Sequence, residues 1–386
     1  MNHRERVLTA LSHQEPDRVP IDLGGCCVTS ITVLTYRAFR RQLGLPEIDI
    51  QVAEIVQGLA WVDNDVLEAI GADVIPVYPN APSGYQAVIE DCGDGATCFK
   101  DEFGATLKKP KDGLYYDWCE FPLKEPTLES LEKIPWPDPE DPARFAGLRE
   151  KALKLRNETD YALFGTAPCG HDLFNQFFRV RGMADAMTDF LLNEELVEAF
   201  LERLTKTIIR SQELFLTEVG DLLDVHFAAD DLSGQTGPLI SPRLYRRLVK
   251  PRWARIISAI KSKTKAKICY HSCGAIDEFI PDLIEIGVDA INPVQVAARG
   301  MDSAELKKKY GNKLSFWGGG CDTQRVLPFG SAAGVREEVR RRIRDFAPGG
   351  GFIFNPVHNI QPGVPAENVA ALFRAAKEFG DYPIRL

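Results

Sequence analysis

The stretch AKICYHSCGAIDEF, residues 266–279, joins an apolar run to a polar turn. The residues KICYH (267–271) have the apolar, β-prone composition of a buried strand. This strand ends on His271, and Ser272, Cys273 and Gly274 follow it directly. Because α/β folds build their sites at the carboxyl ends of parallel strands, the stretch predicts an imidazole and a thiol at a functional edge.

Seven further runs of this kind recur along the chain, separated by segments with helical periodicity. Strands that alternate with helices form right-handed βαβ units and a parallel sheet. Eight such units predict an α/β fold of the closed (β/α)₈, or TIM, barrel type. A doubly wound open sheet is the alternative, but its Gly-x-Gly-x-x-Gly turn does not follow the first run. The other runs are VPIDL (19–23), DVIPVY (73–78), YALFGT (161–166), LDVHFA (223–228), VDAIN (288–292), KLSFWG (313–318) and GFIFN (351–355).

Residues 80–137 interrupt this alternation. Turn residues at Gly93–Gly95 and near Asp112–Gly113 separate short β-prone runs, and a Pro-rich link ends the segment. The pattern predicts β-hairpins inserted after the second barrel strand, covering the mouth of the barrel. We expect the whole chain, 1–386, to form one barrel domain that carries 80–137 as a small β subdomain.

Charge and composition exclude several classes of function. The 46 basic and 55 acidic residues give a net charge of −9, which argues against non-specific nucleic-acid binding. No run of 18 apolar residues is present, so we expect no membrane span. The charged first twenty residues hold no apolar signal core, and nine cysteines are spread over the chain. We therefore expect a cytoplasmic protein with reduced cysteines and no disulfide framework.

The carboxyl ends of the eight predicted strands share one rim, and chemically active side chains follow most of them. Thiols, imidazoles, carboxylates and amides at one rim are the groups from which enzymes build metal and substrate sites. These residues are Cys26, Cys27, Cys169, His171, Asp230, Asp231, Gln235, His271, Cys273, Asn292, Gln295, Cys321, Asp322, Asn355 and His358.

The rim residues include a set suited to zinc. Catalytic zinc has three protein ligands and one open position, and it binds thiolate sulfur and imidazole nitrogen. His271, Cys273 and Cys321 follow the fifth and seventh predicted strands, which lie close enough in a barrel to share an ion. His358 is a candidate for a fourth ligand or a substrate contact. The alternative is a chance His-x-Cys pair without a metal.

The remaining rim residues have plainer alternatives. Asp230 and Asp231 are candidate catalytic acids, but they would serve equally well as caps of the following helix. The amides of Gln235, Asn292, Gln295 and Asn355 are candidates for orienting a substrate by hydrogen bonds. We interpret Cys26, Cys27 and Cys169 as small core or rim residues, and His226 as a core histidine.

Several long stretches together resemble the uroporphyrinogen decarboxylase superfamily. The similarity extends from about residue 160 to the end of the chain, and more weakly over residues 4–22. The family fold is a (β/α)₈ barrel, in agreement with the strand pattern. The stretches are ADDLSGQTGPLISPRLYRRLVKPR (229–252), HSCGAIDEFIPDLIEIGVDAINPVQ (271–295), LSFWGGGCDTQRVLPFG (314–330) and NPVHNIQPGVPAENVAALFRA (355–375).

One branch of this superfamily, the true decarboxylases, uses no metal. Its members hold the carboxylates of a porphyrinogen with an Arg-rich stretch of the kind Met-Arg-Gln-Ala-Gly-Arg. The matching region here, DLGGCCVTSITVLTYRAFRR (22–41), lacks that stretch. His358 falls where decarboxylases have a histidine, and Asp73 is a candidate for their aspartate in a different local context. The resemblance to this branch is therefore incomplete.

The other branch contains zinc methyltransferases that serve corrinoid proteins, and it implies a different activity. Its His-x-Cys pair after the fifth strand is matched by His271 and Cys273. Its third ligand is a cysteine near the end of the eighth strand, where His358 stands here, while Cys321 follows the seventh strand. We favour Cys321 as the third ligand, with His358 close enough to complete or replace it.

The leading hypothesis from this resemblance is zinc-dependent methyl transfer between a small substrate and a corrinoid (cobalamin) carried by a partner protein. The substrate would be a methyl ether, a methylamine-type compound or a thiol. The chain has no Asp-x-His-x-x-Gly cobalamin motif, so a partner must bring the corrinoid. The alternatives are a metal-free decarboxylase with a cationic pocket and a barrel with a closed, structural zinc site. A homodimer is possible.

Overall fold

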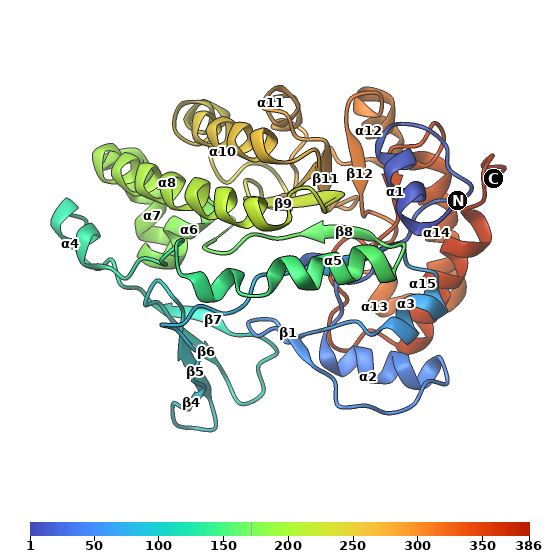
Figure 1. Cartoon of the computed structure of the whole chain (residues 1–386), viewed down its shortest axis with the longest axis horizontal. Helices are drawn as coiled ribbons and strands as arrows, with labels where there is room; N and C mark the ends of the chain where they lie inside the picture. The colour runs from blue at the N-terminus through green and yellow to red at the C-terminus, as the bar shows by residue number, and fades with distance from the viewer. Residues whose placement is uncertain (171) are drawn as a thin grey trace.

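The computed structural model describes residues 1–170 and 172–386. Its central element is a sheet of seven parallel strands in the order β13–β12–β11–β10–β9–β8–β3 (Figure 1). Each strand lies inside or within one residue of a run expected from the sequence. Their bounds are β3 (Val74–Val77), β8 (Ala162–Gly165), β9 (Val225–Ala229), β10 (Lys267–His271), β11 (Ala290–Asn292), β12 (Ser315–Trp317) and β13 (Phe352–Ile353).

The first predicted strand closes this sheet, although only a few of its residues pair. Ile21 forms a parallel bridge with Phe354, and the Asp22 N–H donates to the Phe354 carbonyl at 2.8 Å. On the other side, the Asp73 N–H donates to the Ile21 carbonyl at 2.7 Å. Pro20 has no N–H to donate, which limits the ladder here. The fold is the predicted α/β barrel, and the open-sheet alternative is wrong.

Helices surround the barrel (Figure 1). In α8 the buried residues Val197, Leu201, Leu204 and Ile208 recur every three or four positions, which forms one apolar stripe. None of the helices in the described ranges is long and apolar enough to cross a membrane. The helices are α1 (His3–Leu11), α2 (Val33–Gln42), α3 (Asn64–Ile70), α4 (Leu128–Lys133), α5 (Leu148–Glu158), α6 (Phe174–Arg181), α7 (Met183–Leu192), α8 (Glu194–Val219), α9 (Pro242–Leu244), α10 (Lys250–Lys263), α11 (Ile280–Glu285), α12 (Ser303–Tyr310), α13 (Val326–Phe329), α14 (Ala332–Phe346) and α15 (Ala366–Phe379).

Aromatic side chains fill the inside of the barrel. The ring of Phe164 lies between those of Phe227 and Trp317, with centroid distances of 6.2 and 5.1 Å. The indole Nε1 of Trp317 donates to Asp22 Oδ2 at 2.8 Å, which ties β12 to the closing residues 20–22. Asp22 is completely buried, and this burial raises the pKa of its carboxyl to about 6.

The predicted hairpins are present as a four-stranded antiparallel sheet that projects from the barrel away from both termini (Figure 1). Its strands are β4 (Glu90–Asp91), β5 (Thr97–Lys100), β6 (Thr106–Lys109) and β7 (Asp117–Glu120). A second hairpin, β1 (Val52–Glu54) and β2 (Leu59–Ala60), was not expected from the sequence. Ile55 and Val56 at its tip pack on Phe99, Leu107 and Tyr116 of the inserted segment.

The turn between β4 and β5 carries a disulfide that joins Cys92 to Cys98. The turn at Gly93–Gly95 folds the chain back and leaves the two Cα atoms 6.0 Å apart, within the usual reach of a disulfide. This pair corrects the prediction that all nine cysteines are reduced. The other seven cysteines are free thiols.

Candidate active site

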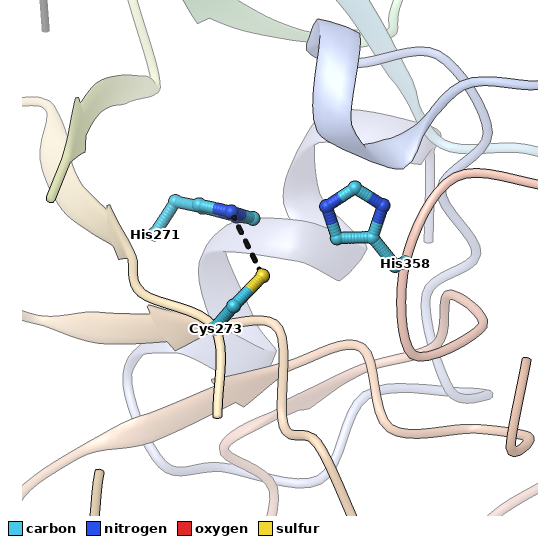
Figure 2. Close-up of side chains that lie close together, drawn as sticks. All are labelled: His271, Cys273 and His358. Carbon is cyan, nitrogen blue, oxygen red and sulfur yellow. Dashed lines mark hydrogen bonds between the residues drawn. The ribbon is translucent and has the colours of Figure 1, made fainter. Parts of the chain in front are cut away.

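Three side chains suited to a metal converge at the carboxyl end of the barrel. His271 is the last residue of β10, Cys273 lies in the turn after it, and His358 lies in the loop after β13. One ligand atom from each lies within 4.8 Å of the other two. His271 Nε2 lies 3.5 Å from Cys273 Sγ, and Figure 2 shows the His358 ring facing this pair from the opposite side.

The turn after β10 places the thiol by a close backbone contact. Gly274 has φ +88°, and a Cβ there would lie 2.4 Å from the Ser233 carbonyl oxygen, so the position requires glycine. The Cys273 N–H donates to Asp231 Oδ1 at 2.7 Å. The same oxygen lies 3.7 Å from His271 Nε2. Asp231 therefore fixes the cysteine backbone and is the carboxylate beside the imidazole.

Asn292, at the end of β11, orients the His271 ring. The Asn292 amide nitrogen donates to the Trp317 carbonyl at 3.0 Å, which fixes which end of the amide is oxygen. That oxygen lies 2.7 Å from His271 Nδ1, so Nδ1 must carry the ring proton. His271 Nε2 therefore presents a lone pair toward Cys273, which is the form that binds a metal.

Burial sets the protonation of the other two groups. The pKa of the Cys273 thiol is raised by burial and by the neighbouring Asp231 carboxylate, so the thiol keeps its proton in the absence of a cation. Burial and the nearby His271 lower the pKa of His358 to about 4, so its imidazole is neutral. Neutral imidazole is the ligand form of histidine, and a bound cation would replace the thiol proton.

The donor set fits zinc. Two imidazoles and one thiol suit a borderline-soft ion and give three protein ligands, the number found in catalytic zinc sites. Cys273 and His358 also line a cavity, so an ion held by this set would border space for a substrate.

Cys321, the predicted third ligand, does not join this group. Its side chain is completely buried in the hydrophobic core, and its sulfur contacts the Asp322 carbonyl at 3.9 Å. In this geometry His358, rather than Cys321, lies beside His271 and Cys273. The exchange follows from the course of the loop after β13, which turns His358 toward the end of β10.

The geometry also gives Asp230 a different place from the one expected of a catalytic acid. It is completely buried and accepts hydrogen bonds from the backbone N–H groups of Leu173, Phe174 and Asn175 at the start of α6. The Trp253 indole donates to it at 3.0 Å. Asp230 thus caps a helix that precedes it in the chain, rather than the helix after it, and is not offered to a ligand.

The cavity beside the cluster has a volume of about 360 Å³. The predicted substrate residues Gln235 and Gln295 line it, and Gln295 Oε1 accepts the Gly274 N–H at 2.6 Å. Asn355 does not line it and is completely buried, and its amide nitrogen donates to the carbonyls of Asp22 and Thr29. Asn292 and Asn355 therefore hold the protein at this end of the barrel and are not part of the cavity wall.

Sequence reasoning missed several residues of this cavity, namely Ser233, Gly234, Pro293, Thr323, Gln324, Val357, Asn359 and Gln361. Most of them follow the end of a strand by only a few positions. Their place in the loops at the rim was therefore the one sequence feature that could have predicted them. His171, a predicted rim residue, lies outside the described residues. A separate cavity of about 670 Å³ borders the inserted sheet, and none of the residues that line it belongs to the metal cluster.

Relatives of the chain carry two activities. It is 24% identical over 303 residues to a methylated-thiol–coenzyme M methyltransferase of Methanosarcina mazei, covering 76% of this chain and 75% of that one. It is also 23% identical over 290 residues to a uroporphyrinogen decarboxylase of Pseudoalteromonas translucida, covering 69% of this chain and 74% of that one.

A solved structure of a methyltransferase from Methanosarcina mazei has the same fold. The alignment covers 98% of this chain and 99% of that chain, with a TM-score of 0.63 and 16% identity. The model of the family described as uroporphyrinogen decarboxylase (URO-D) matches residues 120–379, which include β8 to β13 and all three residues of the cluster. Because this match covers more than half of the chain, the chain belongs to the uroporphyrinogen decarboxylase (URO-D) family.

Proposed function

We propose that this chain is a zinc-dependent methyltransferase that moves a methyl group between a small substrate and a corrinoid carried by a partner protein. The observation that carries the proposal is the group of His271, Cys273 and His358 beside the 360 Å³ cavity. The likeness to the methylated-thiol–coenzyme M methyltransferase supports the methyl-transfer part. The cytoplasmic location and the homodimer stay predictions.

In this proposal each residue has a defined task. His271, Cys273 and His358 hold the ion, while Asn292 and Asp231 position the first two of them. Zinc, when bound, would act as a Lewis acid on the heteroatom of the substrate or hold a thiol as its thiolate. Gln235 and Gln295 orient the substrate from the cavity wall. The heteroatom that loses the methyl group keeps the bonding electron pair.

The lining of the cavity argues against the decarboxylase alternative. A porphyrinogen carries many carboxylates, and a site for it needs cationic side chains to neutralise them. Among the described residues that line the cavity, none is lysine or arginine. The structural-zinc alternative requires a fourth protein ligand in a closed shell, whereas the described cluster holds three donors and borders open space.

Asp73 does not lie where a catalytic aspartate of the barrel would lie. It directly precedes β3, at the amino end of that strand, whereas the metal cluster follows the carboxyl ends of β10 and β13. Arg6 Nη1 lies 2.6 Å from Asp73 Oδ1, Arg18 Nη1 lies 2.8 Å from Oδ2, and His3 contacts the same carboxylate. We therefore assign Asp73 to an ion network under the barrel.

Metal content tests this proposal first. Mass spectrometry of protein purified without an affinity tag should find one zinc per chain, and Cys273→Ala should remove it. The zinc protein should then transfer a methyl group from a methyl ether or thioether to free cobalamin, and the variant should not. A chain that neither contains nor takes up zinc would contradict the proposal and return the decarboxylase to first place.

A further inference from the structure

We infer that this chain forms a homodimer in which helix α7 packs against α7 of a second copy. Sequence reasoning left a homodimer open and could not name a surface for it. The inference goes beyond the proposed function and does not depend on zinc. It comes from α7 itself, which is apolar on both its buried and its exposed face.

One face of α7 is buried against the rest of the chain. Ala186, Asp189 and Phe190 are all buried, and their spacing is that of one helix face. The Phe190 ring lies 5.1 Å from that of Phe174 and 5.7 Å from that of Phe177, both on α6. These contacts anchor α7 in the core and fix the direction in which its opposite face points.

That opposite face is exposed and largely apolar. Its large side chains Met183, Leu191 and Leu192 are 53%, 71% and 82% exposed. Asp185 is the exposed charged residue of the helix, and its carboxylate lies 3.3 Å from the guanidinium of Arg181. A helix that is apolar all round is normally buried, and a contiguous apolar face marks a contact site. The uncharged outward residues are Met183, Ala184, Met187, Thr188, Leu191 and Leu192.

No other part of the described chain covers this face. Figure 1 shows α7 at the end of the molecule opposite to the two termini, beside α6 and α8. Leu192 and Phe329 are the two large apolar side chains that are more than 80% exposed in the described ranges. Phe329 lies on the four-residue helix α13, in a groove with Arg325, Glu337 and Arg341. The exposed face of α7 is therefore the longer apolar surface of the two.

The shape of the α7 face is self-complementary. Residues four positions apart on a helix form a ridge, and here Met183, Met187 and Leu191 form a ridge of large side chains. The smaller Ala184 and Thr188 lie beside it. Across a two-fold axis, the ridge of each copy can lie over the small side chains of the other. An antiparallel pair also places each helix N-terminus beside a C-terminus of the partner subunit, which the helix dipoles favour.

Charge also favours a second copy as the occupant. Each chain carries a net charge of −9, so two copies repel each other unless their contact surface adds no carboxylate pairs. The outward residues of α7 meet this condition. Interfaces with unrelated soluble proteins are about as polar as the rest of the surface, whereas homodimer interfaces are more apolar.

Analytical ultracentrifugation of the full chain tests the inference. The native chain, of 43.0 kDa, should sediment as a dimer. Sodium chloride at about 1 M should leave the dimer intact, because salt screens charges and the contact is apolar. A native chain that stays monomeric at high micromolar concentration would overturn the inference and leave the face to a different protein. A dimer that dissociates in salt would also overturn it.

Variants locate the interface. Leu191→Glu should raise the dissociation constant of the dimer at least about 100-fold, because it buries a charge without a partner. Leu191→Met keeps an apolar side chain and should leave the dimer intact. Phe329→Glu is the matched control, since it introduces the same charge at a more exposed residue outside α7.

Met183→Glu repeats the test at the other end of the ridge, so the inference stays testable if Leu191→Glu does not fold, which circular dichroism checks. A dimer that survives both glutamate variants of α7, or that is lost in Phe329→Glu, would contradict the inference.

Cysteine cross-linking tests the antiparallel arrangement. The background is Cys119→Ser, which removes an exposed thiol. Thr188→Cys lies near the middle of α7, and therefore near the two-fold axis, and should form a disulfide between the two copies on mild oxidation. Met183→Cys lies at the end of the helix, far from its counterpart, and should not. Cross-linking of Met183→Cys without that of Thr188→Cys would contradict this pairing.

Discussion

At the scale of single residues, Asn292 determines what His271 can do. The Asn292 amide donates to the Trp317 carbonyl and accepts from His271 Nδ1, so one side chain fixes both the ring and its tautomer. A metal-binding histidine depends on such a partner because the partner leaves the correct nitrogen free and raises its basicity. Asn292 was predicted to contact the substrate, and its geometry supports an indirect role instead.

We therefore expect Asn292→Ala to weaken zinc binding by about 10- to 100-fold, the usual effect of removing such a partner. Asn292→Asp should restore most of the affinity, since its carboxylate also accepts the Nδ1–H of His271. Competition with a chromogenic chelator measures both. Equal affinity in the native chain and Asn292→Ala would show that His271 is oriented by other contacts or does not bind the metal.

The choice between His358 and Cys321 as third ligand gives a second prediction. His358→Ala should lose zinc on dialysis, because only His271 and Cys273 would remain. Cys321→Ala should keep one zinc per chain and cost about 1–2 kcal/mol of the free energy of unfolding, because it removes a buried sulfur from the core. Metal analysis and denaturant unfolding of the two variants separate these outcomes, and the opposite pattern of zinc loss would restore Cys321.

Residue type and spacing predicted that His271 and Cys273 lie together at the barrel rim, and the structure places them there because both follow directly from the end of one strand. The same reasoning chose Cys321 over His358 on chemical softness, since sulfur is the better zinc ligand. Residue type and spacing do not predict the path of the loops after β12 and β13, and this path decides which side chain turns inward. Ser233 went unnoticed as a residue of the cavity wall because its place depends on the close approach of its carbonyl to Gly274.

At the scale of elements, Asp230 connects three parts of the barrel. It directly follows β9, caps the start of α6 through three backbone N–H groups, and accepts from Trp253 on α10. Burial raises the pKa of Asp230, and the nearby Asp172 adds to this rise. Its carboxylate is thus fully used in holding these elements together.

We expect Asp230→Ala to lower the free energy of unfolding by roughly 3 kcal/mol, because several buried N–H groups lose their acceptor. Asp230→Asn keeps one acceptor oxygen and should cost less. Urea unfolding measures both, and the zinc content per folded chain should not change in either variant. Native stability of Asp230→Ala together with loss of methyl transfer would instead identify Asp230 as a catalytic acid.

Strands and turns could be predicted from the sequence where runs of apolar residues and turn residues are clear. The run KICYH coincides with β10, and the turns at Gly93–Gly95 and Asp112–Gly113 fall between the expected strands of the inserted sheet. The β1–β2 hairpin was not predicted because its strands are only a few residues long. It is stabilised by packing on Phe99, Leu107 and Tyr116 of the inserted segment. Such tertiary contacts leave no local signal in residues 52–60.

At the scale of the whole molecule, the barrel is closed by very few residues. Residues 20–22 join β13 to β3, and Asp22 reaches inward to the Trp317 indole and to the Gly25 N–H, both at 2.8 Å. Strand count predicted a closed barrel, but it could not show that the first strand is this short, because closure depends on pairing between residues more than 300 positions apart.

This closure gives a prediction for the pH dependence of stability. Burial raises the pKa of Asp22 from 3.8 in the unfolded chain to about 6, so the folded chain holds the proton more tightly. The contribution of Asp22 is therefore fully present below pH 3.8 and is lost as the pH rises through 6. A shift of about two units corresponds to roughly 3 kcal/mol.

Asp22→Asn cannot ionise, so it should remove this dependence. The free energy of unfolding of the native chain, minus that of Asp22→Asn, should fall by roughly 3 kcal/mol between pH 3 and pH 8. Urea unfolding of both proteins at unit steps of pH measures the difference, and groups common to the two chains cancel. A difference that stays constant over this range would mean that Asp22 is ionised in the folded barrel, with the Trp317 and Gly25 donors outweighing the effect of burial.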